Sequence, residues 1–173
     1  MKTISYRKGV TLVEALMVIG VLAVLLGLAM LVYLLVHASI LANITQQEAM
    51  TILSATQGMK ADDGNGSKIL ATADLIPHSY IFGENLVTPY GTKLDVWFDK
   101  VNDNDVLELQ FWSLPRNACV RLPLLMTNNA EEINVNGFIL TGSDKVATLS
   151  PKDLSSNCYD GGGNFFSVKY PRS

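Results

Sequence analysis

The feature that most limits how this chain can fold is an apolar run without charges from Ala15 to Val36. At a rise of about 1.5 Å per residue, a helix over this run is about 33 Å long, enough to cross the core of a bilayer. One acid, Glu14, directly precedes the run. Because a charge in hydrocarbon costs about 2.5 to 3.5 kcal/mol on insertion scales, we expect this acid to have a partner or a task.

The residues before the run indicate the orientation of the chain in a membrane. Lys2, Arg7 and Lys8 are basic, and residues 1–9 contain no acid. Positive residues tend to remain on the cytoplasmic side, so the N-terminus is predicted to stay inside and the C-terminal part to be exported. After about Asn43 the sequence has mixed polarity and is long enough to form a soluble domain with its own core.

Charge and composition argue against several classes of function. The chain has a net charge of −3, and without residues 1–9 it would have −6, so binding to a nucleic-acid backbone is not expected. Neither acidic turn, at 61–67 or at 100–105, completes an EF-hand loop for calcium. In a loop that starts at Asp63, Lys68 occupies the sixth position, where the motif requires glycine. His37 and His78 have no partner pattern typical of catalysis. We therefore predict no enzyme activity, no cofactor and no metal site.

The hydrophobic pattern predicts an α+β fold. One helix is expected from about Val10 to Lys60, its second half carrying an apolar stripe that lies on a sheet, with Glu48 elsewhere on the helix. Residues 91–99 and 105–114 alternate as two strands of an antiparallel hairpin, and 164–170 as a strand near the C-terminus. Residues 132–142 form either one strand or two around a turn at Asn136-Gly137. Short helices are expected around Cys119, where Pro123 would interrupt the helix, and after Ser150.

Two further features of the exported part leave alternatives open. Cys119 and Cys158 allow one intramolecular disulfide, which an oxidising compartment would favour, and two buried free thiols are the other interpretation. Closing this loop would stabilise the fold by about 4 kcal/mol in the chain-entropy model. Trp97 and Trp112 are out of phase with the predicted core faces, so either they pack on a neighbouring subunit or the faces are assigned wrongly.

The N-terminal residues carry a resemblance to a known family. Lys8-Gly9, then Val10-Thr11-Leu12-Val13-Glu14, then an apolar helix resemble the class III signal of prepilins in the type IV filament superfamily. The resemblance implies that a prepilin peptidase cleaves after Gly9 and methylates the new N-terminal residue, Val10. It also gives Glu14 the role of the family's glutamate at the fifth mature position.

Physical reasoning supports the role that the resemblance gives to Glu14. Cleavage before Val10 would create an α-amino group beside apolar surface, and a carboxylate one helical turn away could meet such an amine on a neighbouring chain. In a bundle of apolar helices this pairing relieves two buried charges together, whereas a subunit out of register leaves both unpaired at a cost of several kcal/mol. Glu14 is therefore predicted to set the register of stacked subunits.

The rest of the chain resembles type IVb pilins, notably those of bundle-forming pili and of the thin pili of conjugative plasmids. The similar segments, in order, are 75–80, 88–96, 117–122, 148–160 and 165–171. The resemblance implies a pilin fold, in which Cys119 and Cys158 bracket the surface-exposed D-region. It divides the chain into a leader (1–9), a hydrophobic transmembrane and filament-core helix (10–42) and a globular periplasmic or extracellular domain (43–173).

These observations together predict a major pilin of a type IVb pilus. The expected partners are identical subunits, the prepilin peptidase and the pilus assembly machinery of the inner membrane. The chain would be a single-pass protein of the bacterial inner membrane before assembly and part of an extracellular filament afterwards. Such a filament would serve adhesion, aggregation or conjugation. The alternatives are a minor pilin, a type II secretion pseudopilin, or a periplasmic enzyme or binding domain on an uncleaved membrane anchor.

Overall fold

A computed structural model describes residues 11–56, 59, 65–72, 75–101 and 104–172 of the chain. Its contacts divide the chain into two units, Met1–His37 and Ala38–Ser173. Helix α1 (Leu12–Ala55) runs through the boundary between them. The predicted N-terminal helix is confirmed over these residues, whereas Val10 and Lys60 lie outside the described residues. We refer below to the second unit as the head domain.

In the first unit, the described residues are Thr11 and the N-terminal part of α1. No proline interrupts it, and the large apolar side chains around the helix are exposed, from 51% at Val36 to 79% at Leu12. This part of α1 is long and apolar enough to cross a membrane. Because an apolar surface of this size is disfavoured in water, the unit requires lipid or other apolar helices around it.

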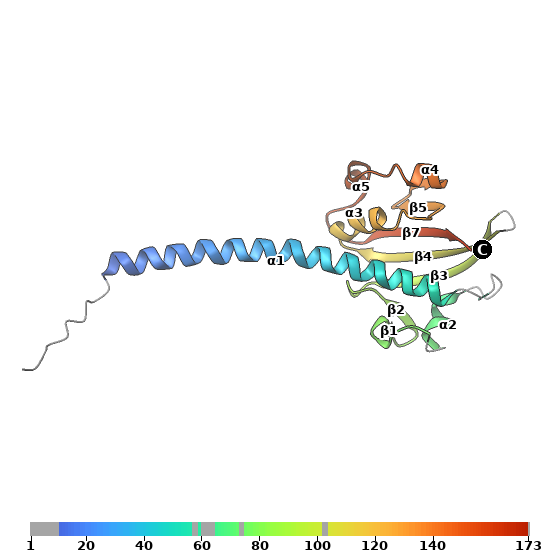
Figure 1. Ribbon diagram of the computed structural model, residues 1–173, viewed down its shortest axis with the longest axis horizontal. Coiled ribbons are helices and arrows are strands. Elements are labelled where there is room, and N and C mark those ends of the chain that lie inside the picture. Colours follow the sequence, from blue (N-terminus) through green and yellow to red (C-terminus); the bar gives the residue numbers. More distant parts are fainter. Residues whose placement is uncertain (1–10, 57–58, 60–64, 73–74, 102–103, 173) are drawn as a thin grey trace, which may run out of the picture. The chain divides into compact units, whose positions relative to one another are not determined.

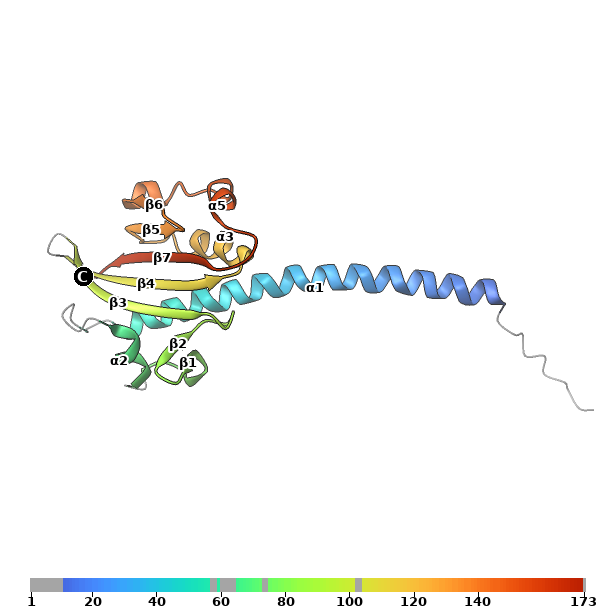
Figure 2. The same cartoon turned by 180° about the vertical axis from the view of Figure 1, so that it is seen from behind.

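In the head domain, the continuation of α1 has one buried stripe. Ala42, Thr45, Glu48, Ala49 and Ile52 are buried at helical spacing. This stripe lies across strands of the sheet, with α1 in front of them in Figure 1 and behind them in Figure 2. The predicted packing of an amphipathic second half on a sheet is therefore confirmed, but the expectation that Glu48 lies away from the buried stripe was wrong.

The described residues of the head domain contain one antiparallel sheet of seven strands in the order β1-β2-β3-β4-β7-β5-β6. The strands are β1 (Ile81–Phe82), β2 (Asn85–Val87), β3 (Lys93–Val101), β4 (Asn104–Leu114), β5 (Glu132–Val135), β6 (Phe138–Thr141) and β7 (Asn164–Pro171). The predicted hairpin is β3 with β4, in which Leu94 pairs with Phe111 and Phe98 with Leu107. Strands β1 and β2 add two strands to those expected from the sequence.

The turn at Asn136-Gly137 divides the segment that could have been one strand. Asn136 and Gly137 both have positive φ angles, 51° and 92°, as a tight hairpin turn requires. The turn joins β5 to β6, where Val135 pairs with Phe138. Of the two sequence interpretations, the hairpin is therefore the one that the structure supports.

The other helices are α2 (Gly66–Thr72), the 3-10 helix η2 (His78–Tyr80), α3 (Arg116–Leu125), α4 (Ser143–Val146) and α5 (Pro151–Asn157). Ser150 caps α5 and Pro151 is at its first helical position, as predicted. Asp153 bonds back to Ser150 and completes a capping box, which was not predicted. Helix α3 continues through Pro123, contrary to the sequence expectation. This proline is near the end of α3, where its missing N–H removes only one helical hydrogen bond.

Candidate assembly site

The site predicted from the sequence begins at the first turn of α1. Glu14 Oε2 accepts hydrogen bonds from the backbone N–H of Thr11 (2.9 Å) and from its hydroxyl (3.0 Å). The N–H of Glu14 donates in return to Thr11 Oγ1 at 3.3 Å. Thr11 precedes the helix and Glu14 is three residues further on, so the two form a capping box. The acid at the head of the apolar run thus has a local partner.

The capping box leaves part of the carboxylate available. Both hydrogen bonds reach Oε2, and Glu14 Oε1 has no partner in the part of the chain that the structure describes. The side chain is exposed and is surrounded along the helix by exposed apolar residues such as Leu12 and Val13. The carboxylate is therefore held by its own chain through Oε2. Lys8, Gly9 and Val10 lie outside the described residues, so their predicted cleavage, methylation and pairing with Glu14 stay predictions.

Thr11 is the residue of this site that the sequence interpretation missed. The spacing Thr-x-x-Glu before an apolar run was a sufficient signal for a capping box. From the sequence, Glu14 was expected to make an intermolecular contact, and its bond to Thr11 was not predicted. Glu14 thus also has a local function within its own helix, and the intermolecular contact stays a prediction.

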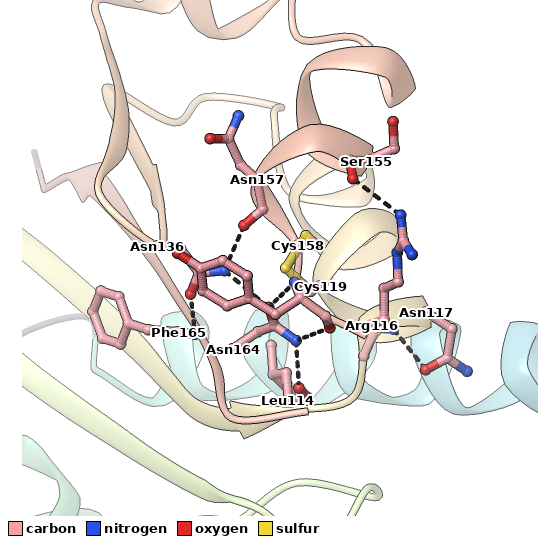
Figure 3. Close-up of a disulfide and its surroundings, with 12 residues drawn as sticks. Leu114, Arg116, Asn117, Cys119, Asn136, Ser155, Asn157, Cys158, Asn164 and Phe165 are labelled. Carbon is pink, nitrogen blue, oxygen red and sulfur yellow. Dashed lines mark hydrogen bonds between the residues drawn. A yellow bond between two sulfur atoms is a disulfide. The ribbon is translucent and has the colours of Figure 1, made fainter. Parts of the chain in front are cut away.

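The disulfide between Cys119 and Cys158 is confirmed, with a Cα–Cα distance of 5.9 Å. It joins α3 to the end of α5, and both cysteines are buried (Figure 3). Arg116, also on α3, donates to the carbonyl oxygen of Ser155 at 3.1 Å and forms an ion pair with Asp160. The two helices are therefore linked by a covalent bond and by an arginine on the same side of the domain.

Asn164 holds the chain segments beside the disulfide (Figure 3). This buried side chain accepts from the N–H of Tyr159 at 2.7 Å and from the side-chain amide of Asn136 at 2.9 Å. Its own amide donates to the carbonyl oxygens of Leu114 (3.0 Å) and Tyr159 (3.1 Å). A single residue at the start of β7 thus satisfies polar groups from three other segments, a role that no residue pattern indicated.

Glu48 is an unusual residue in the buried stripe of α1. It is fully buried, and neither carboxylate oxygen has a hydrogen-bond partner among the described residues. Burial raises its pKa from 4.5 to about 8, because the interior disfavours the charged form. Glu48 is therefore mainly protonated at neutral pH, and its neutral side chain packs inside the domain.

The exposed face of the sheet carries both tryptophans. Trp97 and Trp112 are 39% and 41% exposed, which confirms that the core faces of β3 and β4 were assigned correctly. The ring of Trp112 packs against that of Phe165 with centroids 4.7 Å apart. In Figure 2, no labelled helix covers this side of β3, β4 and β7. Packing of either tryptophan on a neighbouring subunit stays a prediction.

Comparison with known proteins gives no family for this chain. The arrangement of a long apolar N-terminal helix, an antiparallel sheet and a C-terminal disulfide is compatible with a pilin-like fold. No protein-family model matches the sequence, and no curated protein matches it significantly.

The described residues also offer no evident metal centre. No group of three or more potential metal ligands occurs within the described ranges.

Proposed function

We propose that this chain is the major structural subunit of a type IVb pilus. The observation that carries the proposal is an exposed apolar helix with one oriented carboxylate, Glu14, at its first turn. The same helix continues into a disulfide-containing α+β head domain, which would form the outer surface of a filament. The subunits would add by the same contact repeated along a helix, which generates an open fibre.

The apolar helices would provide the association energy of such a filament. Their burial against each other contributes about 25 cal/mol per Å² of apolar surface, summed over many identical subunits. This term is not directional, so it does not select a register. The pairing of Glu14 Oε1 with the amine of Val10 on a neighbouring copy would supply that selectivity. Adhesion, aggregation and conjugation are the tasks that we propose for the filament.

The test is the N-terminal mass of the chain in filaments sheared from cells that have an active prepilin peptidase. We expect the filaments to consist mainly of this chain, beginning at a methylated Val10. A chain that retains Met1 would contradict the proposal and favour a membrane-anchored periplasmic domain. A correctly processed chain that is only a trace component would instead identify a minor pilin or a pseudopilin.

A further inference from the structure

The head domain contains an open pocket of about 390 Å³ whose lining comes from two helices. Ser39, Ala42 and Asn43 of α1 line one side, and Arg121, Leu124 and Leu125 of α3 line the other. The side-chain amide of Gln46 donates to the carbonyl oxygen of Leu125 at 2.9 Å, which ties the two helices together next to the pocket. The pocket is thus part of the packed domain and combines polar groups with leucines.

Arg121 is the charged group of this pocket. Its side chain is half-buried and donates a hydrogen bond to the hydroxyl of Ser39. No carboxylate in the described part of the chain lies within ion-pair distance of it, whereas Arg116 on the same helix pairs with Asp160. A guanidinium has five donor hydrogens in a fork that matches phosphate or carboxylate, so Arg121 retains donors for an anion.

The position of the pocket in the chain indicates which anion is near. Ser39 follows Val36, the last residue of the apolar run, by three residues. Since an extended chain covers at most about 3.6 Å per residue, Ser39 is no further than about 11 Å from the end of that run. The headgroup layer on each side of a bilayer core is about 5 to 8 Å thick. When the run spans a membrane, the polar end of the pocket is therefore close to the level of the lipid phosphates.

We propose that this pocket binds the phosphodiester of a phospholipid in the outer leaflet of the membrane in which the chain is anchored. The remaining donors of Arg121 bind the phosphate, while the Ser39 hydroxyl accepts from the same guanidinium and orients it. Ala42, Leu124 and Leu125 cover the glycerol and the first acyl methylenes. The proposal shares with the proposed function only the insertion of the apolar run into a membrane. It gives the head domain a docked position on the membrane surface before assembly.

The lining favours a lipid over the carboxylate of a second copy of the chain. Both would supply a negative charge for Arg121, but an acidic side chain has at most two methylenes, whereas a lipid brings a glycerol and long acyl chains that can cover the leucines of the pocket. A phosphate also accepts two parallel hydrogen bonds from a guanidinium, which an ammonium cannot provide in the same geometry. Replacement of Arg121 by lysine should therefore weaken the contact without abolishing it.

The experiment measures whether lipid phosphorus lies next to the Arg121 guanidinium. The full chain, labelled with ¹⁵N-arginine, is reconstituted into vesicles of phosphatidylethanolamine and phosphatidylglycerol, and ¹⁵N–³¹P dipolar dephasing is recorded in the solid state. The Arg121 resonance is the one that disappears from the spectrum of the Arg121→Gln variant. If the glutamine variant does not fold, Arg121→Lys identifies the resonance in the same way. We expect dephasing at Arg121 and none at Arg116. Equal behaviour of the two arginines would overturn the proposal.

A second measurement is the apparent affinity with which the detergent-solubilised chain retains phospholipid. We expect Arg121→Gln to lower this affinity by about tenfold, because one charge-assisted contact is lost. Arg116→Gln is the matched control and should leave the affinity unchanged. Two results would contradict a lipid site. One is that inorganic phosphate, added to the chain in detergent without lipid, dephases Arg121 as strongly as the lipid vesicles do. The other is a contact between Arg121 and a ¹³C-labelled carboxylate of a second copy.

These measurements do not depend on filament formation. The Glu14→Ala variant should keep the lipid contact in vesicles even where it fails to assemble. If the mature chain proves to keep its leader, the proposed function fails while the phosphorus contact at Arg121 can still be observed. Conversely, filaments could form from a chain whose pocket binds no lipid.

Discussion

The two parts of α1 differ in which side chains are exposed and which are buried. In the first unit, apolar residues such as Leu12 and Leu26 are exposed, at 79% and 70%, and the carboxylate of Glu14 lies among them. In the head domain, the polar Thr45 and the acid Glu48 are fully buried. One glutamate is thus hydrogen-bonded and exposed, and the other is buried with no hydrogen-bond partner among the described residues.

The difference shows which contacts the chain completes by itself. The environment of Glu48 comes from its own sheet, so its protonation depends on the fold of a single copy. The apolar surface around Glu14 is not covered by any described residue of its own chain, and such a surface is disfavoured in water. The second part of α1 therefore has a buried face within the head domain, whereas the first part has none among the described residues.

The largest expected effect comes from removing the acid of the first unit. Glu14→Ala should abolish filament assembly. Without the carboxylate, a subunit in the correct register can no longer form the charge pair that distinguishes it from a subunit out of register. Electron microscopy of sheared material checks this result. Circular dichroism and the disulfide state should show a folded head domain, and the matched change Glu131→Ala, at an exposed acid of that domain, should leave filaments intact. Normal filaments from the Glu14 variant would remove the proposed difference between the two glutamates.

Loss of the disulfide should affect only the head domain. The double change Cys119→Ser and Cys158→Ser is expected to lower its free energy of unfolding by about 2 to 5 kcal/mol. Urea denaturation of the full chain in detergent, followed by tryptophan fluorescence of Trp97 and Trp112, measures this value. Far-ultraviolet circular dichroism should show that the first part of α1 stays helical. Coincident loss of both signals would mean that the two units depend on each other for folding.

The burial of Glu48 makes the stability of the head domain depend on pH. Its folded pKa of about 8 is above the ordinary value of 4.5, so the favourable neutral form is fully present below about pH 4.5. That contribution is lost as the pH rises through about 8. We expect wild type to lose about 4 kcal/mol of unfolding free energy between pH 5 and pH 9, with most of the loss due to Glu48.

The variant Glu48→Gln isolates this effect because it keeps the shape of the side chain but cannot ionise. It should be more stable than wild type at pH 9 and should show a smaller pH dependence in urea denaturation. Glu131→Gln, which changes an exposed acid of the same domain, is the control. If Glu48→Gln has the pH profile of wild type, the buried carboxyl is not the group responsible.

The smallest expected effect is at the capping box. Thr11→Ala removes the hydroxyl that bonds Glu14 and should destabilise the first turn by about 1 kcal/mol, which raises amide exchange there about fivefold. Hydrogen exchange in detergent measures the change, with Thr11→Ser as the control that retains a hydroxyl. Filaments should still form, since Glu14 remains. A complete loss of assembly would give Thr11 a function beyond capping.

The sequence predicted the parts of the fold that have a long period or a specific pairing. The apolar run, the β3-β4 hairpin and the two cysteines were sufficient for α1, the centre of the sheet and the disulfide. Strands β1 and β2 have only two and three residues, which is too short for a period to be read. Glu48 was placed outside the buried stripe because of its charge, although it is three residues after Thr45 and four before Ile52.

The candidate site was predicted in part for a similar reason. Glu14 was recognised because one acid next to a long apolar run is rare, but its bond to Thr11 was overlooked in favour of a contact between chains. Asn164 and Arg121 depend on segments far apart in the sequence, since Asn164 bonds Leu114 and Arg121 bonds Ser39. Contacts of this kind follow from the topology of the sheet and helices, which residue patterns alone do not determine.

The place of β7 has a consequence for how the head domain folds. This strand, Asn164–Pro171, lies between β4 and β5 in the sheet. Without it, the hairpin of β3 and β4 and the hairpin of β5 and β6 have no strand to join them. Each hairpin can form from residues that are close in the sequence, but the two become one sheet only when a later segment of the chain inserts between them, so β7 closes the contacts of longest sequence separation.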